Sequence, residues 1–216
     1  MKIQIELRSI GLASIGWGIS WLSGADVPIF RRPIRLGESI RYEVVIPGSS
    51  FKGALRSAAY RIAEAYGFRS CGGRWCDKKS PCDVCALFGV SGNSIPSALK
   101  VSDFKPKTRA ETLIVNRIRI DDSSMNVSEG GLFSEEYLPP GIEFSGMLEL
   151  SGGVISQDLA GLLLLSLAEL RLGRLGRHSL FDLRIDEDEE FSELVSGSKY
   201  SELLDDLRRW LWSEVL

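Results

Sequence analysis

Hydrophobic and polar positions alternate along several short stretches of the chain. At the N-terminus, Ile3 and Ile5 alternate with Lys2, Gln4 and Glu6, and such alternation predicts a half-buried strand. Further strand-like stretches are IRYEVVIPG, ALKVSDF, TLIVNRIRID, IEFSGMLELSG and GRHSLFDLRID. Apolar residues recur instead at helical spacing over residues 50–66, over residues 157–171 and in the C-terminal segment YSELLDDLRRWLWSEVL, which predicts amphipathic helices there.

The order of these elements predicts an α+β protein. A strand, a helix, strands, a second helix and a final strand match a βαββαβ ferredoxin-like core with loop insertions. Residues 1–185 would form this domain, with insertions at residues 71–85 and 122–140. Residues 186–216 would add an acidic linker and a C-terminal amphipathic helix.

Glycine and proline interrupt the pattern in two places. Residues 17–39, WGISWLSGADVPIFRRPIRLGES, predict a long loop. Residues 122–140 predict an excursion with turns at Gly130–Gly131 and Pro139–Pro140. Gly67 predicts the end of the first helix, and Ser49 or Ser50 its N-cap.

Charge is distributed unevenly, although the net charge is only −3. Residues 1–120 carry 19 Lys and Arg against 9 Asp and Glu, whereas residues 121–216 carry 7 against 20. This asymmetry suggests a basic face for a polyanion and an acidic face turned elsewhere, although charges that only decorate a solvated surface would look the same.

The longest apolar run, LAGLLLLSLAEL (Leu159–Leu170), is too short to span a bilayer. No signal segment is evident, so we expect a cytoplasmic protein without membrane partners.

All four cysteines lie in CGGRWCDKKSPCDVC, as Cys71, Cys76, Cys82 and Cys85. Four thiolates can close a tetrahedron around zinc, and such a saturated site would be structural. Disulfides would need an oxidising compartment, of which the sequence gives no sign. The sequence therefore predicts a structural Zn²⁺ as a cofactor.

The predicted helix after IPGSS begins with two cations on one face, Lys52 and Arg56. The N-terminus of a helix is already the positive end of its dipole, so cations there favour an anionic partner. Ser49 and Ser50 could donate hydrogen bonds to a phosphate or cap the helix. A solvated helix face is the simpler interpretation of the same pattern.

The tryptophans could stack on bases, although core packing is their more frequent use. They are Trp17, Trp21, Trp75, Trp210 and Trp212.

Four stretches of the chain together resemble one family. IPGSSFKGALRSA resembles the I-P-G-S-S-x-K-G-x-x-R motif of the RAMP superfamily, whose members are subunits of CRISPR ribonucleoprotein effector complexes. CDVCALFG and NRIRIDDSSMNVSEGGLFSEEYLPPGIEF resemble the blocks that follow it, and LRLGRLGRHSLFDLRI is similar to a degenerate form of the C-terminal glycine-rich loop. These matches keep the family's order from about residue 11 to residue 185, and they look most like the backbone subunit of type III complexes.

The resemblance implies a role in antiviral defence. It implies an RNA-recognition-motif-like core that binds guide RNA, assembles with further copies of itself along that RNA, and joins other effector-complex subunits. It also implies a hairpin that acts as a thumb and kinks the guide–target duplex, which we place at residues 122–140. Phosphate contacts would come from the IPGSS turn, Lys52 and Arg56, and from the glycine-rich loop. The loop residues are Arg171, Arg174, Arg177 and His178.

The resemblance further implies an endonuclease. In type III backbone subunits, an aspartate in the loop before IPGSS is associated with metal-dependent cleavage of target RNA, and Asp26 is the aspartate of that loop here. Asp26 could recruit Mg²⁺ or help to deprotonate the attacking 2′-hydroxyl. The neighbouring Arg31, Arg32 and Arg35 could neutralise the phosphate. Two alternatives stay open: a scaffold subunit that binds guide RNA and cuts nothing, and a processing ribonuclease that uses His178.

Overall fold

A computed structural model describes residues 1–16, 23–90, 97–151, 155–176, 179–186 and 188–212. Its centre is an antiparallel sheet with the strand order β4-β8-β1-β9, and a short strand, β5, also pairs with β8. The strands are β1 (Lys2–Ser9), β4 (Leu99–Val101), β5 (Lys105–Pro106), β8 (Glu143–Leu150) and β9 (Phe181–Ile185). The structure therefore confirms a mixed α+β protein built on an antiparallel sheet.

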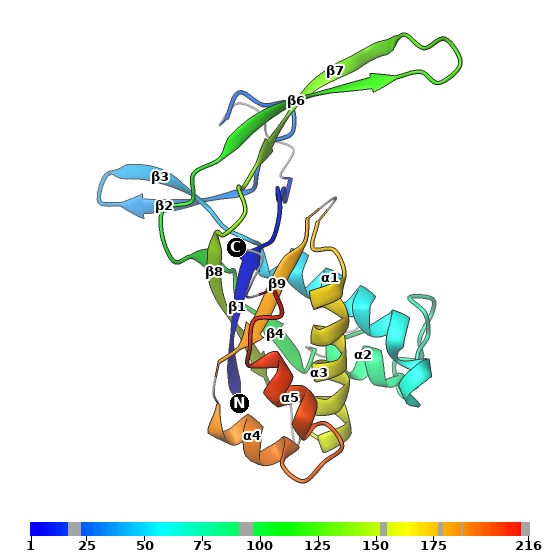
Figure 1. Ribbon diagram of the computed structural model, residues 1–216. Coiled ribbons are helices and arrows are strands. Elements are labelled where there is room, and N and C mark those ends of the chain that lie inside the picture. The colour runs from blue at the N-terminus through cyan, green and yellow to red at the C-terminus, as the bar shows by residue number, and fades with distance from the viewer. Residues whose placement is uncertain (17–22, 91–96, 152–154, 177–178, 187, 213–216) are drawn as a thin grey trace.

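Two long helices pack against each other beside this sheet (Figure 1). Helix α1 (Gly48–Ile62) connects β1 to β4 through the intervening segments, and α3 (Gln157–Leu172) connects β8 to β9. In the sheet, β8 lies between β4 and β1, and β1 lies between β8 and β9. This is the interleaved strand order of a βαββαβ unit. The predicted alternation is confirmed for Ile3 and Ile5, which are fully buried, but it is wrong at Glu6, which is also buried and forms ion pairs.

Helix α3 is apolar on most of its circumference, as expected of a buried helix. It begins where predicted, and the Ser156 side chain accepts a hydrogen bond from the Leu159 N–H. Among the residues that the structure describes, no helix is long and apolar enough to cross a membrane.

A ribbon of two strands replaces part of the predicted loop over residues 17–39. Strands β2 (Arg31–Leu36) and β3 (Ser39–Val44) pair around Gly37, whose φ of 63° suits the tight turn. The loop prediction is wrong there because Pro33 is tolerated in an isolated ribbon, where one edge of each strand needs no N–H donor. Residues 17–22 lie outside the described part of the chain.

A second ribbon extends away from the central sheet (Figure 1). It is the hairpin of β6 (Leu113–Ile120) and β7 (Val127–Tyr137). The excursion predicted over residues 122–140 covers only the tip and β7, because the hairpin already begins at Leu113. Strand β7 continues through Gly130–Gly131, where a turn was predicted, but the ladder is irregular there, since Ile118 pairs with Leu132 and Ile120 pairs with Val127. A Cβ on Gly131 would lie 2.8 Å from the Arg119 carbonyl oxygen of β6, so glycine allows the two strands to approach there. The turn lies at the hairpin tip, where Asp121 accepts backbone N–H bonds from Ser123 and Ser124.

The C-terminal region differs from the single long helix that the pattern predicts. The acidic segment contains a helix of its own, α4 (Glu189–Val195), followed by α5 (Ser201–Leu207). The acidic run favours α4 because its carboxylates lie at the positive end of the helix dipole, and the Asp188 side chain caps the helix at the Phe191 N–H. After α5 the chain turns back, and Trp210 lies between the guanidinium groups of Arg8 and Arg184.

A buried ion pair joins α3 to β9. The Nε of Arg171 lies 2.7 Å from Oδ1 of Asp182, whose side chain is fully buried, and the Trp212 N–H donates to the other oxygen. Arg171 is thus used inside the protein and is not available for the phosphate contact that the sequence suggested.

We expect Asp182→Ala to destabilise the protein by about 3–5 kcal/mol, because it leaves the Arg171 charge buried without its partner. The midpoint of thermal unfolding should fall by about 10 °C. The control is Asp205→Ala, which removes the exposed pair between Asp205 and Arg208 and should cost less than about 0.5 kcal/mol in urea unfolding. Equal costs for the two variants would contradict this assignment.

Candidate functional site

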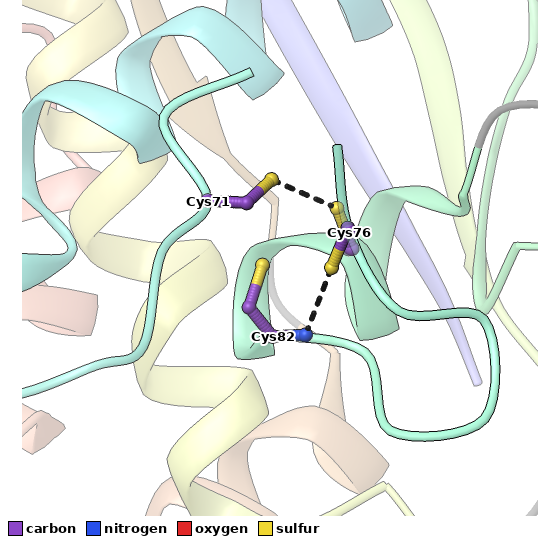
Figure 2. Close-up of side chains that lie close together, drawn as sticks. Cys71, Cys76 and Cys82 are labelled. Atoms are coloured by element: carbon purple, nitrogen blue, oxygen red, sulfur yellow. Dashed lines mark hydrogen bonds between the residues drawn. The ribbon is translucent and has the colours of Figure 1, made fainter. Parts of the chain in front are cut away.

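The four cysteines form one cluster. Their sulfur atoms all lie within 4.8 Å of one another, and Sγ of Cys71 lies 3.5 Å from Sγ of Cys85. Zn–S bonds of about 2.3 Å would place the corners of a thiolate tetrahedron about 3.8 Å apart. Figure 2 shows Cys71, Cys76 and Cys82 close together, with the Cys82 N–H donating to Sγ of Cys76. The cluster is therefore compatible with a structural metal such as zinc.

The local structure of the cysteine loop explains how the four sulfur atoms come together. Beyond α1, a 3₁₀ turn, η2 (Glu64–Tyr66), ends at Gly67 in the left-handed region, and the chain then enters the cysteine loop. The loop closes at α2 (Asp83–Phe88), where the Asp83 carboxylate accepts from both the backbone N–H and the guanidinium of Arg69. Cys82 is the N-cap of α2 and Cys85 lies in its first turn, so this helix positions half of the cluster.

Two side chains of α1 reach the cysteines. Nη2 of Arg56 lies 3.5 Å from Sγ of Cys85, and the Tyr60 hydroxyl lies 3.7 Å from Sγ of Cys71 and 3.6 Å from Sγ of Cys85. Burial acts to raise the pKa of Cys71, but hydrogen bonds from Tyr60 and Cys85 outweigh it and lower that pKa to about 7. Arg56 thus places its positive charge against sulfur atoms that become anionic on binding a divalent metal.

Lys52 also has partners inside the protein. Its ammonium donates to the Ser97 hydroxyl and, at 2.7 Å, to the Leu99 carbonyl oxygen. Burial, and to a smaller extent the charge of Arg56, lowers the pKa of Lys52. The two cations that the sequence assigned to one anion therefore point to β4 and to the cysteine cluster.

The IPGSS bend is partly packed and partly exposed. The predicted cap is wrong, because Pro47 occupies the N-cap and no side chain caps α1. Gly48 lies against β4, where its N–H donates to Asp103 and an added Cβ would lie 2.4 Å from the Val101 carbonyl oxygen. Ser49 and Ser50 are exposed. These hydroxyls are what the bend offers to a ligand.

Asp26 is held against the β6–β7 hairpin. Its exposed carboxylate accepts two hydrogen bonds at Oδ2 from Ser134 of β7, 2.7 Å from the backbone N–H and 2.9 Å from the hydroxyl. These bonds, the backbone one first, hold the pKa of Asp26 below its usual range. The following residue, Val27, donates its N–H to the Ser134 carbonyl oxygen. The loop is therefore fixed along β7, and Asp26 is an ionised group at the base of the hairpin.

The arginines near Asp26 are engaged with carboxylates. Arg31 forms a bidentate ion pair with the buried Glu136, and Arg32 forms an ion pair with Asp103. Arg31 is therefore a structural group here, whereas the Arg32 side chain remains half exposed. In the glycine-rich loop, Arg174 is exposed, and Arg177 and His178 lie outside the described residues.

One face of the hairpin is an exposed apolar surface that the sequence analysis missed. Ile118 pairs with Leu132 across the strands, and both are exposed, at 60% and 67%. Next along the ladder on the same face, Asn116 pairs with Ser134, the residue that holds Asp26. Ile118 and Ile120 alternate with arginines in the sequence, which predicts one apolar face of the strand. Nothing local in the sequence indicates that this face stays exposed. Further exposed apolar residues towards the tip are Ile120, Met125 and Val127.

Comparison of the sequence with protein-family models shows which family the chain belongs to. The family model of the RAMP superfamily matches residues 32–192. The chain belongs to the RAMP superfamily. The match begins within β2 and ends within α4, so this RAMP domain includes α1, the cysteine cluster and the hairpin, whereas Asp26 lies just before the matched region.

The fold is also found among solved structures. A chain titled "Type IV-B CRISPR Complex" superimposes with a TM-score of 0.62 at 17% sequence identity, over 88% of this chain and 92% of that chain. At this identity the likeness shows a shared fold. No curated protein matches the sequence.

Proposed function

We propose that this RAMP protein is an RNA-binding backbone subunit of a CRISPR effector complex. The observation that carries the proposal is the family match over residues 32–192, which contains the IPGSS motif and the hairpin. The structural neighbour comes from a type IV-B complex. We assign this protein instead to a type III complex, on the resemblance of its ordered motifs and on Asp26.

Guide RNA is proposed to bind along the IPGSS bend and the glycine-rich loop. The exposed hydroxyls of Ser49 and Ser50 and the guanidinium of Arg174 would contact phosphates, which fixes the RNA without reading its sequence. Lys52 and Arg56 would add positive potential behind the bend, and would contact phosphate directly only by exchanging their present partners.

The β6–β7 hairpin is proposed as the thumb that interrupts the guide–target duplex. Its exposed pair, Ile118 and Leu132, would act as an apolar wedge between base pairs, and insertion of apolar side chains unstacks and kinks a duplex. Because Ser134 lies on the same face, the wedge would bring the kinked nucleotide to Asp26.

Cleavage of target RNA is proposed to occur at this point. The 2′-hydroxyl gives its proton to water, and its oxygen forms a bond to the adjacent phosphorus as the bond to the 5′-oxygen breaks. The departing 5′-oxygen takes a proton from water, which leaves a 2′,3′-cyclic phosphate and a 5′-hydroxyl. The lowered pKa of Asp26 makes it a weak base, so its role is to supply negative charge for a cation. Asp26 would be the residue of this chain that holds a Mg²⁺, and the ion would supply positive charge that stabilises the phosphate.

The experiment that tests RNA binding uses the purified protein and single-stranded RNAs of increasing length. We expect the number of bound copies, measured by native mass spectrometry, to rise with RNA length. The logarithm of the binding constant should fall linearly with the logarithm of salt concentration, because phosphate contacts release counterions. A single copy at every RNA length, or no binding at low salt, would contradict the proposal.

A further inference from the structure

A basic cleft lies beside the cysteine cluster. Its volume is about 340 Å³. Its polar and aromatic lining consists of Arg56 and Tyr60 of α1 with Arg74, Trp75 and Lys78 of the cysteine loop. Of the described residues that line it, none is an aspartate or a glutamate, although Cys76 and Cys85 of the cluster also line it. Asp77, between Trp75 and Lys78, has its carboxylate bonded to the Lys79 N–H.

Trp75 is the most unusual residue of this cleft because its side chain is 83% exposed. The sequence analysis favoured core packing for the tryptophans, and that interpretation is wrong for Trp75. An exposed indole forgoes on the order of 2 kcal/mol or more of burial free energy. The adjacent Cys76 is buried in the cluster, so the backbone that carries Trp75 is anchored on that side. The cleft therefore presents a flat aromatic surface from a fixed base.

The chemistry around Trp75 selects the class of ligand. A protein-docking surface would surround the indole with apolar residues and would contain few lysines. Here Arg74 and Lys78 flank it, and Arg56 lies over the Tyr60 ring, 5.4 Å from its centre. Aromatic faces among cations are the combination that binds single-stranded nucleic acid, with stacked bases and neutralised phosphates.

We propose that this cleft is an RNA-binding subsite in which one unpaired base stacks on Trp75 while neighbouring phosphates contact Arg74 and Lys78. The inference rests on the proposed RNA-binding function and adds a location to it, the cysteine loop. Stacking of this kind accepts any base, so the subsite would hold RNA without sequence preference. The metal cluster would then have a second effect besides stability, because it fixes the loop that carries the indole.

The test measures binding of fluorescently labelled oligouridine to the metal-loaded full chain. Trp75→Ala should weaken binding about tenfold, and Trp75→Phe should retain most of the affinity, because stacking contributes about 1–3 kcal/mol per base. The matched control is Trp212→Ala, which removes a half-exposed tryptophan beyond α5 and should leave affinity unchanged. Arg74→Ala and Lys78→Ala should each flatten the salt dependence by about 0.7 in slope. RNA carrying 5-iodouridine should crosslink to Trp75 on irradiation.

The outcomes separate this inference from the function it rests on. If the wild-type protein binds no RNA, the proposed function fails and the subsite fails with it. If the wild type binds and Trp75→Ala binds equally well, only the subsite is wrong. If Trp75→Ala loses its metal or unfolds, Trp75→Phe and the crosslink decide, and a crosslink elsewhere overturns the subsite. Loss of self-association without RNA, at unchanged RNA affinity, would make the cleft a protein contact and would also overturn it.

Discussion

Replacing Asp26 by alanine should reduce cleavage of target RNA in the assembled complex by about a hundredfold or more, because it removes the carboxylate proposed to hold the cation, whose stabilisation of the transition state amounts to several kcal/mol. Guide RNA binding should be unchanged, because Asp26 is not among the groups proposed to contact the guide phosphates. The measurement is single-turnover cleavage of labelled target RNA at saturating complex, with product ends identified as cyclic phosphate and 5′-hydroxyl.

Two controls make this result specific. Ser134→Ala removes the hydroxyl that donates to the Asp26 carboxylate and accepts from the Asp26 N–H. It keeps the bond from the Ser134 backbone N–H to the carboxylate, so it should slow cleavage only a few-fold. Asp122→Ala removes an exposed aspartate at the hairpin tip and should have no effect on rate. Full activity of Asp26→Ala would support the scaffold alternative, in which the protein binds guide RNA and cuts nothing.

Loss of the cysteine-bound metal should destabilise the protein by on the order of 5 kcal/mol or more, since metal binding to such loops contributes directly to folding free energy. Cys85→Ser should lower the midpoint of thermal unfolding by about 10 °C or more. Cys85 is buried between α2 and the Tyr60 and Arg56 side chains, so its loss also leaves these donors without their sulfur partner.

The matched control is Ser70→Ala, which changes the loop beside Cys71 without removing a sulfur and should preserve both metal content and stability. Metal analysis of protein purified without chelator should give close to one zinc per chain, and removal by a chelator should reproduce the instability of Cys85→Ser. A wild-type protein that is stable and free of metal would contradict this expectation.

The central sheet could be predicted because its signals are local. Alternation in Lys2–Ser9 and the apolar run of α3 require no knowledge of their partners, and their order alone indicated the βαββαβ unit. The ribbon β2–β3 could not be predicted in the same way. Pro33 argues against a strand, and only the absence of a second neighbour makes it acceptable.

The candidate site was predicted in its residue types more than in its contacts. The cysteine spacing indicated the cluster, and the structure brings all four sulfurs together. Lys52 and Arg56 were expected to share an anion, yet they contact Leu99 and Cys85, which are distant in sequence. The pairing of Arg31 with Glu136, 105 positions away, likewise depends on how the hairpin docks. Such partners follow from tertiary packing and leave no mark on local sequence.

The uncovered isoleucines and leucine of the β6–β7 ribbon have a consequence for how the protein must be produced. A projecting pair of strands with an uncovered hydrophobic face associates readily with other chains and promotes aggregation (Figure 1). Subunits produced in excess over RNA should therefore aggregate. The yield of monodisperse protein should rise when guide RNA is co-expressed.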